Sequence, residues 1–364
     1  MRLTATEAGA AVLPAPAESL APPAAERSRA ARASARPARL TGFQVVATGS
    51  YVPDVVITNE ALERTHGFEA DWVRERTGIR ERRHAAPHQA TSDLCLEACR
   101  RCLRAAGARP EDVDLLIVAS HTPDLSMPAT ANLLQDKLGA ACGAFDIQAA
   151  CSGFLYALAV GAQFVATGNA RLCLVTAGDI PSRIINPADR LTYPLFGDAA
   201  GAVLLAAGAP GQGFLAYQLG SDGSGALLLH RPAGGSLLPL SEEALAANLH
   251  YFQMDGKPVY RWAVQTIVES VGAVLRQAGL TAADVQLFVP HQANLRILRS
   301  AAERLGLPPE KVWTNLDRYG NTVAASVPLA LDEAVAAGRV RRGDPVVLCG
   351  FGSGLSWGTA LLSW

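Results

Sequence analysis

Cys151 is the residue of this chain whose surroundings best suit a nucleophile. In the stretch FDIQAACSGF it follows a strand-like run and stands at the first turn of an expected helix. There, free backbone N–H groups and the helix dipole favour a thiolate, and the same N–H groups can bind the oxyanion of a thioester under attack. The competing interpretation is a cysteine buried at a helix start for packing alone.

Two polar residues later in the chain favour the catalytic interpretation. His291, in VPHQAN, directly follows an expected strand, at the kind of strand end where open α/β sheets bind ligands. Asn321, in YGNTVAAS, stands at a helix start that we expect to be equivalent to that of Cys151. Both side chains can donate a hydrogen bond to a carbonyl oxygen, so together they could stabilise an enolate. A hydrolase would instead need a carboxylate or amide to orient its histidine. The turn GFGSG (350–354) could aim backbone N–H groups at the same point.

Three further cysteines have a spacing that could bind an iron–sulfur cluster. They lie in TSDLCLEACRRCLRAAG (91–107) as C-x3-C-x2-C. The apolar residues of this stretch fall on one helical stripe, with Thr91 or Ser92 as N-cap and Gly107 as the stop. A straight helix spreads its cysteines along one face, whereas a cluster needs a loop that wraps around it. We therefore predict that Cys95, Cys99 and Cys102 pack in the core as small apolar side chains. The same interpretation applies to Cys142, Cys173 and Cys349.

The elements that carry the candidate residues belong to an internal repeat. The stretch LRAAGARPEDVDLLIVASHTP (103–123) reappears as LRQAGLTAADVQLFVPHQAN (275–294), and CSGFLYALAVGAQFVATG (151–168) is matched by NTVAASVPLALDEAVAAG (321–338). Each half runs as helix, glycine stop, acidic turn and apolar strand, followed by a small-residue helix and another strand. Two such halves predict mostly parallel sheets covered on both faces. They also predict two buried helices that bring Cys151 and Asn321 to one centre.

Composition restricts the class of protein. A chain of 364 residues, 49% of them hydrophobic, can bury a large core, and its net charge of -1 argues against nucleic acid or an acidic membrane as the main partner. The longest apolar stretch, 149–162, is too short to span a bilayer. Seven cysteines without a secretory signal predict the reducing cytoplasm. Residues 1–39, rich in Ala, Pro and Arg, are expected to be disordered. Three glutamates, Glu7, Glu18 and Glu26, weaken the alternative of an organelle transit peptide.

Six motifs carry a family resemblance that runs from about Leu40 to Trp364. They are WVRERTGIRERR, DIQAACSGFLYAL, FGDAAGAVLL, VPHQANLRI, GNTVAASVPLALDEAV and GFGSGLSWGTALL. Together they resemble β-ketoacyl-acyl-carrier-protein synthase III. The resemblance implies a thiolase-like α/β fold, a duplicated αβαβα layered sandwich whose pseudo-symmetric halves span 40–212 and 213–364, and a homodimer. It also implies an acyltransferase that condenses a short acyl-CoA, such as acetyl-CoA, with malonyl-acyl-carrier protein to start fatty acid synthesis, without a cofactor or a metal.

The resemblance assigns roles to residues at the matching positions. Cys151 would take the acyl group, and His291 and Asn321 would hold the malonyl carbonyl during loss of CO2. Backbone N–H groups of Cys151 and Ser353 would form the oxyanion hole. The residues implied for CoA binding are Trp72, Arg76, Arg190 and Asn294. Those implied to line the active site are Phe196, Phe351 and Met127. Those implied to receive the carrier protein are Arg261, Arg296, Arg299 and Arg304.

Three departures from the family pattern leave room for other substrates. Ser353 stands where many relatives have glycine, Glu303 interrupts the basic patch, and Met127 takes the position that closes the acyl tunnel across the dimer. The alternative function is therefore priming or acylation in a polyketide or other specialised pathway, with a non-acetyl acyl group. A non-catalytic partner subunit would be expected to have lost the nucleophile or the base, and this chain has both.

Overall fold

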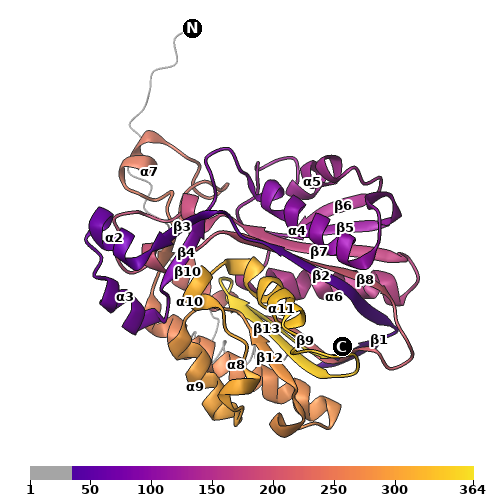
Figure 1. The fold of residues 1–364 in the computed structure, drawn as a ribbon. Coiled ribbons are helices and arrows are strands. Elements are labelled where there is room, and N and C mark those ends of the chain that lie inside the picture. The colour runs from indigo at the N-terminus through magenta and orange to yellow at the C-terminus, as the bar shows by residue number, and fades with distance from the viewer. Residues whose placement is uncertain (1–34) are drawn as a thin grey trace, which may run out of the picture.

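The computed structural model describes residues 35–364 and contains two five-stranded sheets built on one plan. The front sheet has the order β2-β8-β7-β5-β6, and the back sheet has the order β1-β9-β14-β13-β12. From β2 to β5 and from β9 to β12, two antiparallel pairs are followed by one parallel pair, so the sequence repeat is a repeat of the fold (Figure 1). The front strands are β2 (Phe43–Tyr51), β5 (Leu115–Ala119), β6 (Gly143–Ile147), β7 (Leu172–Asp179) and β8 (Ala199–Ala207). The back strands are β1 (Ala38–Thr41), β9 (Gly213–Ser221), β12 (Leu287–Pro290), β13 (Pro345–Gly352) and β14 (Ser356–Ser363).

The prediction of mostly parallel sheets is wrong. β5 pairs in parallel with β6 and β7, and β12 pairs in parallel with β13, but the other pairs of these two sheets are antiparallel. A parallel neighbour requires a crossover connection of roughly a dozen residues or more. β13 and β14 are joined by residues 353–355 alone, and so short a connection can only turn the chain back on itself.

Two helices form the middle layer between the sheets. α6 (Gly153–Ala166) contacts β7 and β5 on one side and β13 and β14 on the other, and α11 (Ser326–Ala336) contacts β8 and β2 as well as β12 and β13. Most residues of both helices are buried, which confirms the prediction of two buried helices. Phe154 and Leu329, both buried at this layer, each contribute roughly 1.5–3 kcal/mol through burial of apolar surface.

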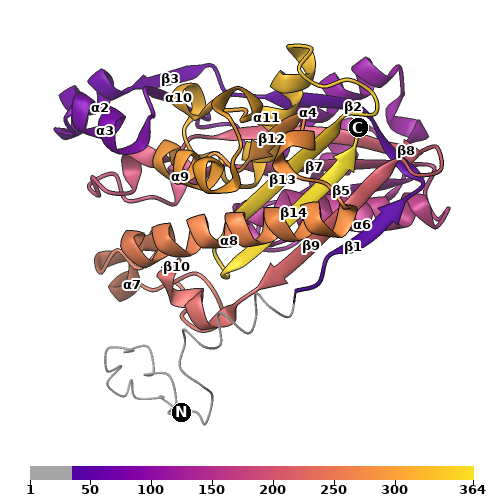
Figure 2. The ribbon, with the colours of Figure 1, turned by 90° about the horizontal axis from the view of Figure 1, so that it is seen from below.

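Further helices cover the outer faces of the two sheets. α4 (Thr91–Ala106) packs on the front sheet, with α5 (Thr130–Leu138) beside it (Figure 1). α8 (Gly256–Ala278) packs on the back sheet, with α9 (Leu295–Leu305) beside it (Figure 2). The molecule is thus layered as helices, sheet, helices, sheet and helices. This arrangement confirms the predicted αβαβα sandwich.

The cysteines of α4 lie in the core, as predicted. Cys95, Cys99 and Cys102 are buried, and burial raises the pKa of each thiol. The start of the helix differs from the prediction. The hydroxyls of Thr91 and Ser92 donate elsewhere, to the carbonyl of Thr122 and the carboxylate of Asp124, and the Asp93 carboxylate accepts the Ala90 N–H at 2.7 Å instead. Gly107 ends the helix in the left-handed conformation, with φ of 64°.

The beginning of the described chain joins the back sheet. β1 starts at Ala38 and pairs with β9, although β2, the next strand along the chain, belongs to the front sheet. The segment predicted to be disordered, residues 1–39, lies outside the described residues except for its last five positions. Apart from β1, the front sheet falls within 43–207 and the back sheet within 213–363, on either side of the predicted boundary between 212 and 213.

Short elements at one end of the molecule complete the fold. Both views place α2, α3 and α7 at this end, away from β8 (Figures 1 and 2). These elements are β3 (Val55–Thr58), α2 (Asn59–His66), α3 (Ala70–Thr77), β4 (Glu81–His84), β10 (Leu229–His230), α7 (Glu242–Ala246), β11 (Gln253–Met254) and α10 (Leu316–Tyr319). Within residues 35–364, no helix combines the length and the apolar character needed to cross a membrane.

Candidate active site

A cavity of about 1620 Å³ is lined by residues of both halves. Its wall includes Cys151 from the front half and His291 and Asn321 from the back half. The structure therefore brings together the three residues predicted to carry the chemistry. Other predicted residues also line it: Trp72, Arg76, Arg190, Phe196, Asn294, Phe351 and Ser353.

Cys151 is presented by a strained turn between β6 and α6. Ala150, the first residue of the 3-10 turn η2 (Ala150–Ser152), has φ of 43°, a value that non-glycine residues seldom adopt because of the Cβ atom, and such strain clusters at active sites. The end of β13 approaches the sulfur closely. A Cβ atom added to Gly352 would lie 2.9 Å from Cys151 Sγ, so only glycine fits at this position. Cys151 itself is partly open to the cavity.

The Cys151 thiol does not have the lowered pKa that a helix start suggests. Burial and, after it, the charge of Asp179 raise its pKa to about 12, against the lowering effect of the backbone N–H groups of Cys151 and Ser353. The prediction that the helix start stabilises a thiolate is therefore wrong for the net pKa of Cys151. The cost of placing a charge in the low dielectric of the protein exceeds the stabilisation that the N–H groups provide. Those two N–H groups are the pair predicted to form the oxyanion hole. The Ser353 hydroxyl is engaged separately, since it donates to the Leu229 carbonyl at 2.6 Å.

His291 is a buried, neutral imidazole. It follows the last residue of β12, and its backbone N–H donates to the Cys349 carbonyl at 2.7 Å. Its ring packs edge-to-face against Phe351, with centroids 5.2 Å apart. Burial lowers the pKa of His291 to about 3, so the ring is uncharged at neutral pH. Its Nδ1 has no hydrogen-bond partner among the residues that the structure describes.

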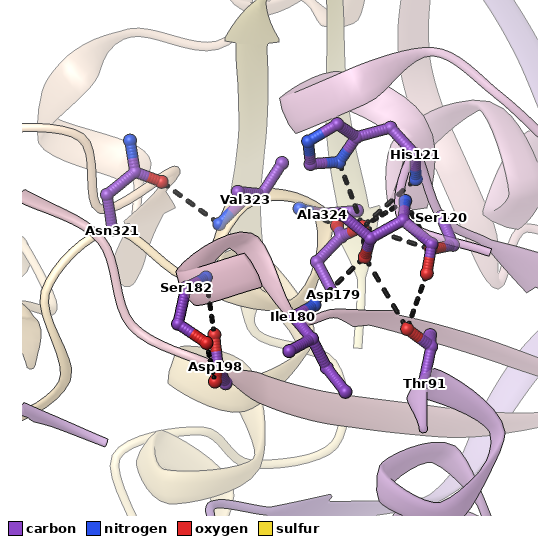
Figure 3. A network of polar contacts seen from close by, with 11 residues as sticks. Thr91, Ser120, His121, Asp179, Ile180, Ser182, Asp198, Asn321, Val323 and Ala324 are labelled. Carbon is purple, nitrogen blue, oxygen red and sulfur yellow. Dashed lines mark hydrogen bonds and ion pairs between the residues drawn. The ribbon is translucent and has the colours of Figure 1, made fainter. Parts of the chain in front are cut away.

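Asn321 is fixed from both sides. Its backbone N–H donates to the Leu195 carbonyl at 2.8 Å, and its carbonyl accepts the Gly197 N–H at 3.0 Å, which ties this part of the back half to the front half. Its side-chain Oδ1 accepts the backbone N–H of Val323 at 2.9 Å (Figure 3). This bond orients the amide and leaves the Nδ2 donors for a ligand.

The predicted equivalence of Asn321 with Cys151 is wrong by three residues. Val323 has φ of 52° and begins the 3-10 turn η8 (Val323–Ala325) ahead of α11, just as Ala150 begins η2 ahead of α6. Ala324 is therefore the counterpart of Cys151. Asn321 lies in the loop before this turn, which the sequence repeat alone did not separate from the helix start.

Asp179, which the sequence analysis missed, lies at the junction of the two halves. Its Oδ1 accepts from the backbone N–H of His121 at 2.9 Å, and His121 Nδ1 lies at the same distance (Figure 3). Further donors to Oδ1 come from Ser120 and Thr122. Its Oδ2 accepts the Ala324 N–H of the other half at 3.0 Å. Burial opposes its charge, but the charge and hydrogen bonds of His121 and the Ala324 N–H hold the pKa of Asp179 below its usual value.

Comparisons with known proteins agree with this geometry. Family models described as 3-Oxoacyl-[acyl-carrier-protein (ACP)] synthase III and as its C terminal part match residues 145–223 and 275–364. A Beta-ketoacyl-[acyl-carrier-protein] synthase III of Rhodopirellula baltica is 51% identical over 343 residues, which cover 89% of this chain and 99% of that protein. The chain belongs to the β-ketoacyl-[acyl-carrier-protein] synthase III family.

Two solved structures illustrate how similar the fold of this chain is to those of known proteins. The 3-oxoacyl-[acyl-carrier-protein] synthase III from Aquifex aeolicus VF5 superposes with a TM-score of 0.82 at 39% identity, covering 89% of this chain and 100% of that chain. The priming β-ketosynthase from the R1128 polyketide biosynthetic pathway has the same TM-score at 37% identity, covering 89% and 97%. The predicted family and fold are thus confirmed, and this synthase III family member is an acyltransferase of the condensing-enzyme type.

In this synthase III family member, Trp72 on α3 is flanked by two arginines. The guanidinium carbon of Arg190 lies 4.6 Å from the ring centroid, and that of Arg76 lies 5.6 Å from it. Asn294 connects this region to α9. Its amide Nδ2 donates to the Arg76 carbonyl at 3.1 Å, and its Oδ1 accepts the Arg296 N–H at 2.9 Å as the N-cap of α9. The oxygen and one N–H of this amide therefore have structural partners.

The other predicted residues fall into two groups. Phe196 and Phe351 are buried and line the cavity, whereas Met127 is 84% exposed and lies outside the cavity of its own chain. Met127 could therefore line an active site only across a contact between subunits, as the family resemblance supposes. The four arginines predicted for docking, Arg261 on α8 and Arg296, Arg299 and Arg304 on α9, are exposed on two helices that pack against each other.

Proposed function

We propose that this chain condenses a short acyl-CoA, such as acetyl-CoA, with malonyl-acyl-carrier protein to give a 3-oxoacyl-carrier protein, the first step of fatty acid synthesis. The observation that carries the proposal is the convergence of Cys151, His291 and Asn321 on one cavity, with the Ser353 backbone N–H at the sulfur. A thiol, an uncharged imidazole and a carboxamide suit acyl transfer and enolate stabilisation. Neither step requires a cofactor, since the acyl-CoA is a substrate.

In the first step, Cys151 takes the acyl group. Its proton must leave as the acyl-CoA arrives, because a thiol with a pKa of about 12 is protonated at neutral pH. The sulfur then attacks the thioester carbonyl and CoA departs as the thiol. The backbone N–H groups of Cys151 and Ser353 stabilise the oxyanion of the tetrahedral intermediate, a contribution of roughly 3 kcal/mol per donor in comparable sites.

In the second step, His291 and Asn321 bind the thioester carbonyl of the malonyl group. The bond to CO2 breaks, and its electron pair forms the enolate that the two donors stabilise. The enolate carbon attacks the acyl carbonyl on Cys151, a carbon–carbon bond forms, and the Cys151 sulfur leaves. An uncharged His291 suits this role, because it keeps its donor strength constant across the physiological pH range.

The surroundings support the remaining assignments. Trp72, Arg76 and Arg190 offer stacking and positive charge to the adenine and phosphates of CoA, and Asn294 lines the path to the sulfur. The exposed arginines of α8 and α9 provide positive charge for an acidic carrier protein. In a homodimer, Met127 would reach the partner's cavity. Seven free cysteines are in keeping with the cytoplasm.

Incubation of the purified protein with acetyl-CoA and malonyl-carrier protein tests the proposal. CO2 and a 3-oxoacyl product should form together. Cys151→Ala should lose acyl transfer, whereas Asn321→Ala should still be acylated and should decarboxylate roughly a hundredfold more slowly, the loss seen for a removed oxyanion donor. Unchanged turnover in Cys151→Ala would refute the assignment.

The alternative is priming in a polyketide pathway with another acyl group, which the similarity to the R1128 priming enzyme favours. Mass spectrometry of Cys151 after exposure to a panel of acyl-CoAs distinguishes the two functions. Preferential acetylation supports initiation of fatty acid synthesis, and preference for a larger acyl group supports the alternative.

A further inference from the structure

His121 lines the cavity of the catalytic residues, but the proposed mechanism gives it no role. It follows the end of β5, next to the end of β7 that carries Asp179, and it lines the same cavity as Cys151. Its side chain is 20% exposed, whereas Asp179 is fully buried. Both its backbone N–H and its ring Nδ1 face the same carboxylate oxygen at 2.9 Å.

The ion pair of His121 with Asp179 reduces the effect of the buried negative charge of Asp179, which would otherwise oppose ionisation of Cys151. A buried carboxylate is costly unless it is paired, and within residues 35–364 the ion pairs give Asp179 a single cationic partner, His121. The negative charge of Asp179 disfavours the thiolate of Cys151. A proton on His121 offsets that charge at close range and so favours ionisation of the nucleophile.

The same carboxylate reaches across to the other half. Asp179 Oδ2 accepts the Ala324 N–H, and the adjacent residue, Val323, donates to the side chain of Asn321. The donor from His121 thus helps to hold a carboxylate that anchors the turn next to Asn321. One ion pair is in this way connected to both chemical steps.

We propose that His121 is a positioning residue for this reaction: its imidazolium offsets the charge of Asp179 beside Cys151 and keeps Asp179 in place to hold the Asn321 turn. The inference rests on the proposed function, because it assigns His121 to acyl transfer at Cys151. His121 itself touches neither substrate nor sulfur in this role.

The charges around His121 fix the sign of the pH dependence. Burial opposes its protonation and Arg231 disfavours it, but Asp179 on β7 favours it, and the net pKa of His121 is raised. Around the Asp179 carboxylate, the titratable groups besides His121 include Cys151 on η2 and Cys95 on α4, whose thiolates its charge disfavours, and the turn at Ala324 contributes an uncharged N–H. As pH rises through the pKa of His121, the positive charge is lost and ionisation of Cys151 becomes harder.

Two substitutions separate the charge from the hydrogen bond. His121→Asn can keep an N–H near the position of Nδ1 without the charge, and His121→Ala removes both. The rate of Cys151 alkylation by iodoacetamide is measured against pH, with no acyl-CoA present. At pH 6, below the pKa of His121, the wild type carries the positive charge, and we expect both variants to be alkylated about tenfold more slowly, because loss of a nearby opposite charge raises the pKa of Cys151 by about one unit. Above the pKa of His121, Asp179→Asn should be alkylated faster than the wild type, because the negative charge beside Cys151 is gone, and the double variant His121→Asn/Asp179→Asn should match Asp179→Asn.

The second readout is malonyl decarboxylation. His121→Ala should slow it roughly tenfold, because the Asn321 turn loses part of its support, and His121→Asn should recover most of that loss. His88→Asn, a change of an exposed histidine, is the matched control and should alter neither readout. Alkylation of folded His121→Asn at the wild-type rate at pH 6 overturns the proposal, as does equal decarboxylation by wild type and His121→Ala. If Cys151 is alkylated as expected but takes no acyl group, the proposed function fails while the pairing stands.

Discussion

Gly352→Ala is the substitution that tests the geometry around the sulfur most directly. Gly352 ends β13, and a methyl group there would lie 2.7 Å from Cys151 Cβ and 2.9 Å from Sγ. Carbon atoms in contact lie about 3.5–4.0 Å apart, so one of the two elements must move by roughly 1 Å. Both sides are constrained, because β13 is paired along its length with β14 and Cys151 is fixed by the start of α6.

The displacement should cost far more activity than stability. A misplacement of about 1 Å can lower a rate by roughly a hundredfold, because the sulfur leaves its alignment with the oxyanion donors. Overpacking of this kind usually costs about 1–3 kcal/mol of the free energy of unfolding. We therefore expect Gly352→Ala to fold, to melt a few degrees lower and to be acylated about a hundredfold more slowly than the wild type.

Quenched time courses, analysed by mass spectrometry of Cys151, give the acylation rate, and calorimetry gives the melting temperature. The matched control is Gly223→Ala, since an added Cβ at Gly223 meets nothing within 4 Å and this residue lies outside the cavity wall. The control should match the wild type in both measurements. Acylation of Gly352→Ala at within about threefold of the wild-type rate would refute the close approach of β13 to the sulfur, because a 1 Å shift should cost much more.

Four further changes probe other parts of the site. Trp72→Ala should raise the KM for acyl-CoA roughly tenfold through loss of stacking, while acylation by a thioester without adenine stays unchanged in steady-state assays. Ser353→Gly should lower the free energy of unfolding by about 1 kcal/mol in urea titrations, because the bond to Leu229 is lost, and should leave acylation within about threefold, since the backbone N–H remains. Arg299→Glu should raise the KM for malonyl-carrier protein, most strongly at low salt, without changing acylation by acyl-CoA. Protonation of His291 should not limit decarboxylation between about pH 8 and pH 5, as measured by CO2 release. The native fold should lose stability as pH falls below about 6.5, because the unfolded chain binds the proton that the buried ring, with a pKa of about 3, does not.

Each of the three substitutions has an outcome that would contradict the role assigned to its residue. An unchanged KM for acyl-CoA in Trp72→Ala would remove that side chain from the CoA site. A hundredfold loss of acylation in Ser353→Gly would mean that the hydroxyl, rather than the N–H, supports the reaction. Docking elsewhere would follow if Arg299→Glu bound the carrier protein normally at low salt.

The sequence was sufficient to predict the convergence of the three chemical groups. Cys151 and His291 follow strands, and the repeat implied that the helices after Cys151 and Asn321 occupy equivalent places between two sheets. The strand ends are local sequence patterns, and the repeat relates the two halves to each other; together they were enough to place the three groups at one centre. The three-residue error at Asn321 arose because a repeat in sequence aligns helices but does not define the turn before them, which only the positive φ of Val323 reveals.

Properties that depend on the surrounding protein could not be predicted in this way. The high pKa of the Cys151 thiol comes from burial and from Asp179, which lies 28 positions along the chain. A signal for Asp179 and His121 did exist, since both stand at the ends of apolar strands. To infer from this signal that Asp179 and His121 meet, one must know that β5 and β7 are parallel neighbours, which brings their polar strand ends together at one edge of the sheet. Strand direction was also mispredicted, because it follows from the connections between strands, whereas an apolar run indicates only that a strand is buried.

The pairing of β1 with β9 has a consequence for biosynthesis. Ala38 lies opposite Tyr217, so 179 further residues must be added before β1 can pair along its whole length with β9. At a translation rate of about 5–20 residues per second, this strand waits roughly ten to thirty-five seconds after it has emerged from the ribosome. β2 follows it through a turn at Gly42, with φ of 93°, and pairs with β8, which is made slightly earlier than β9, since Phe43 lies opposite Ala207, 164 residues on. Protection of the Leu40 amide from hydrogen exchange should therefore appear late on the nascent chain, after that of β2.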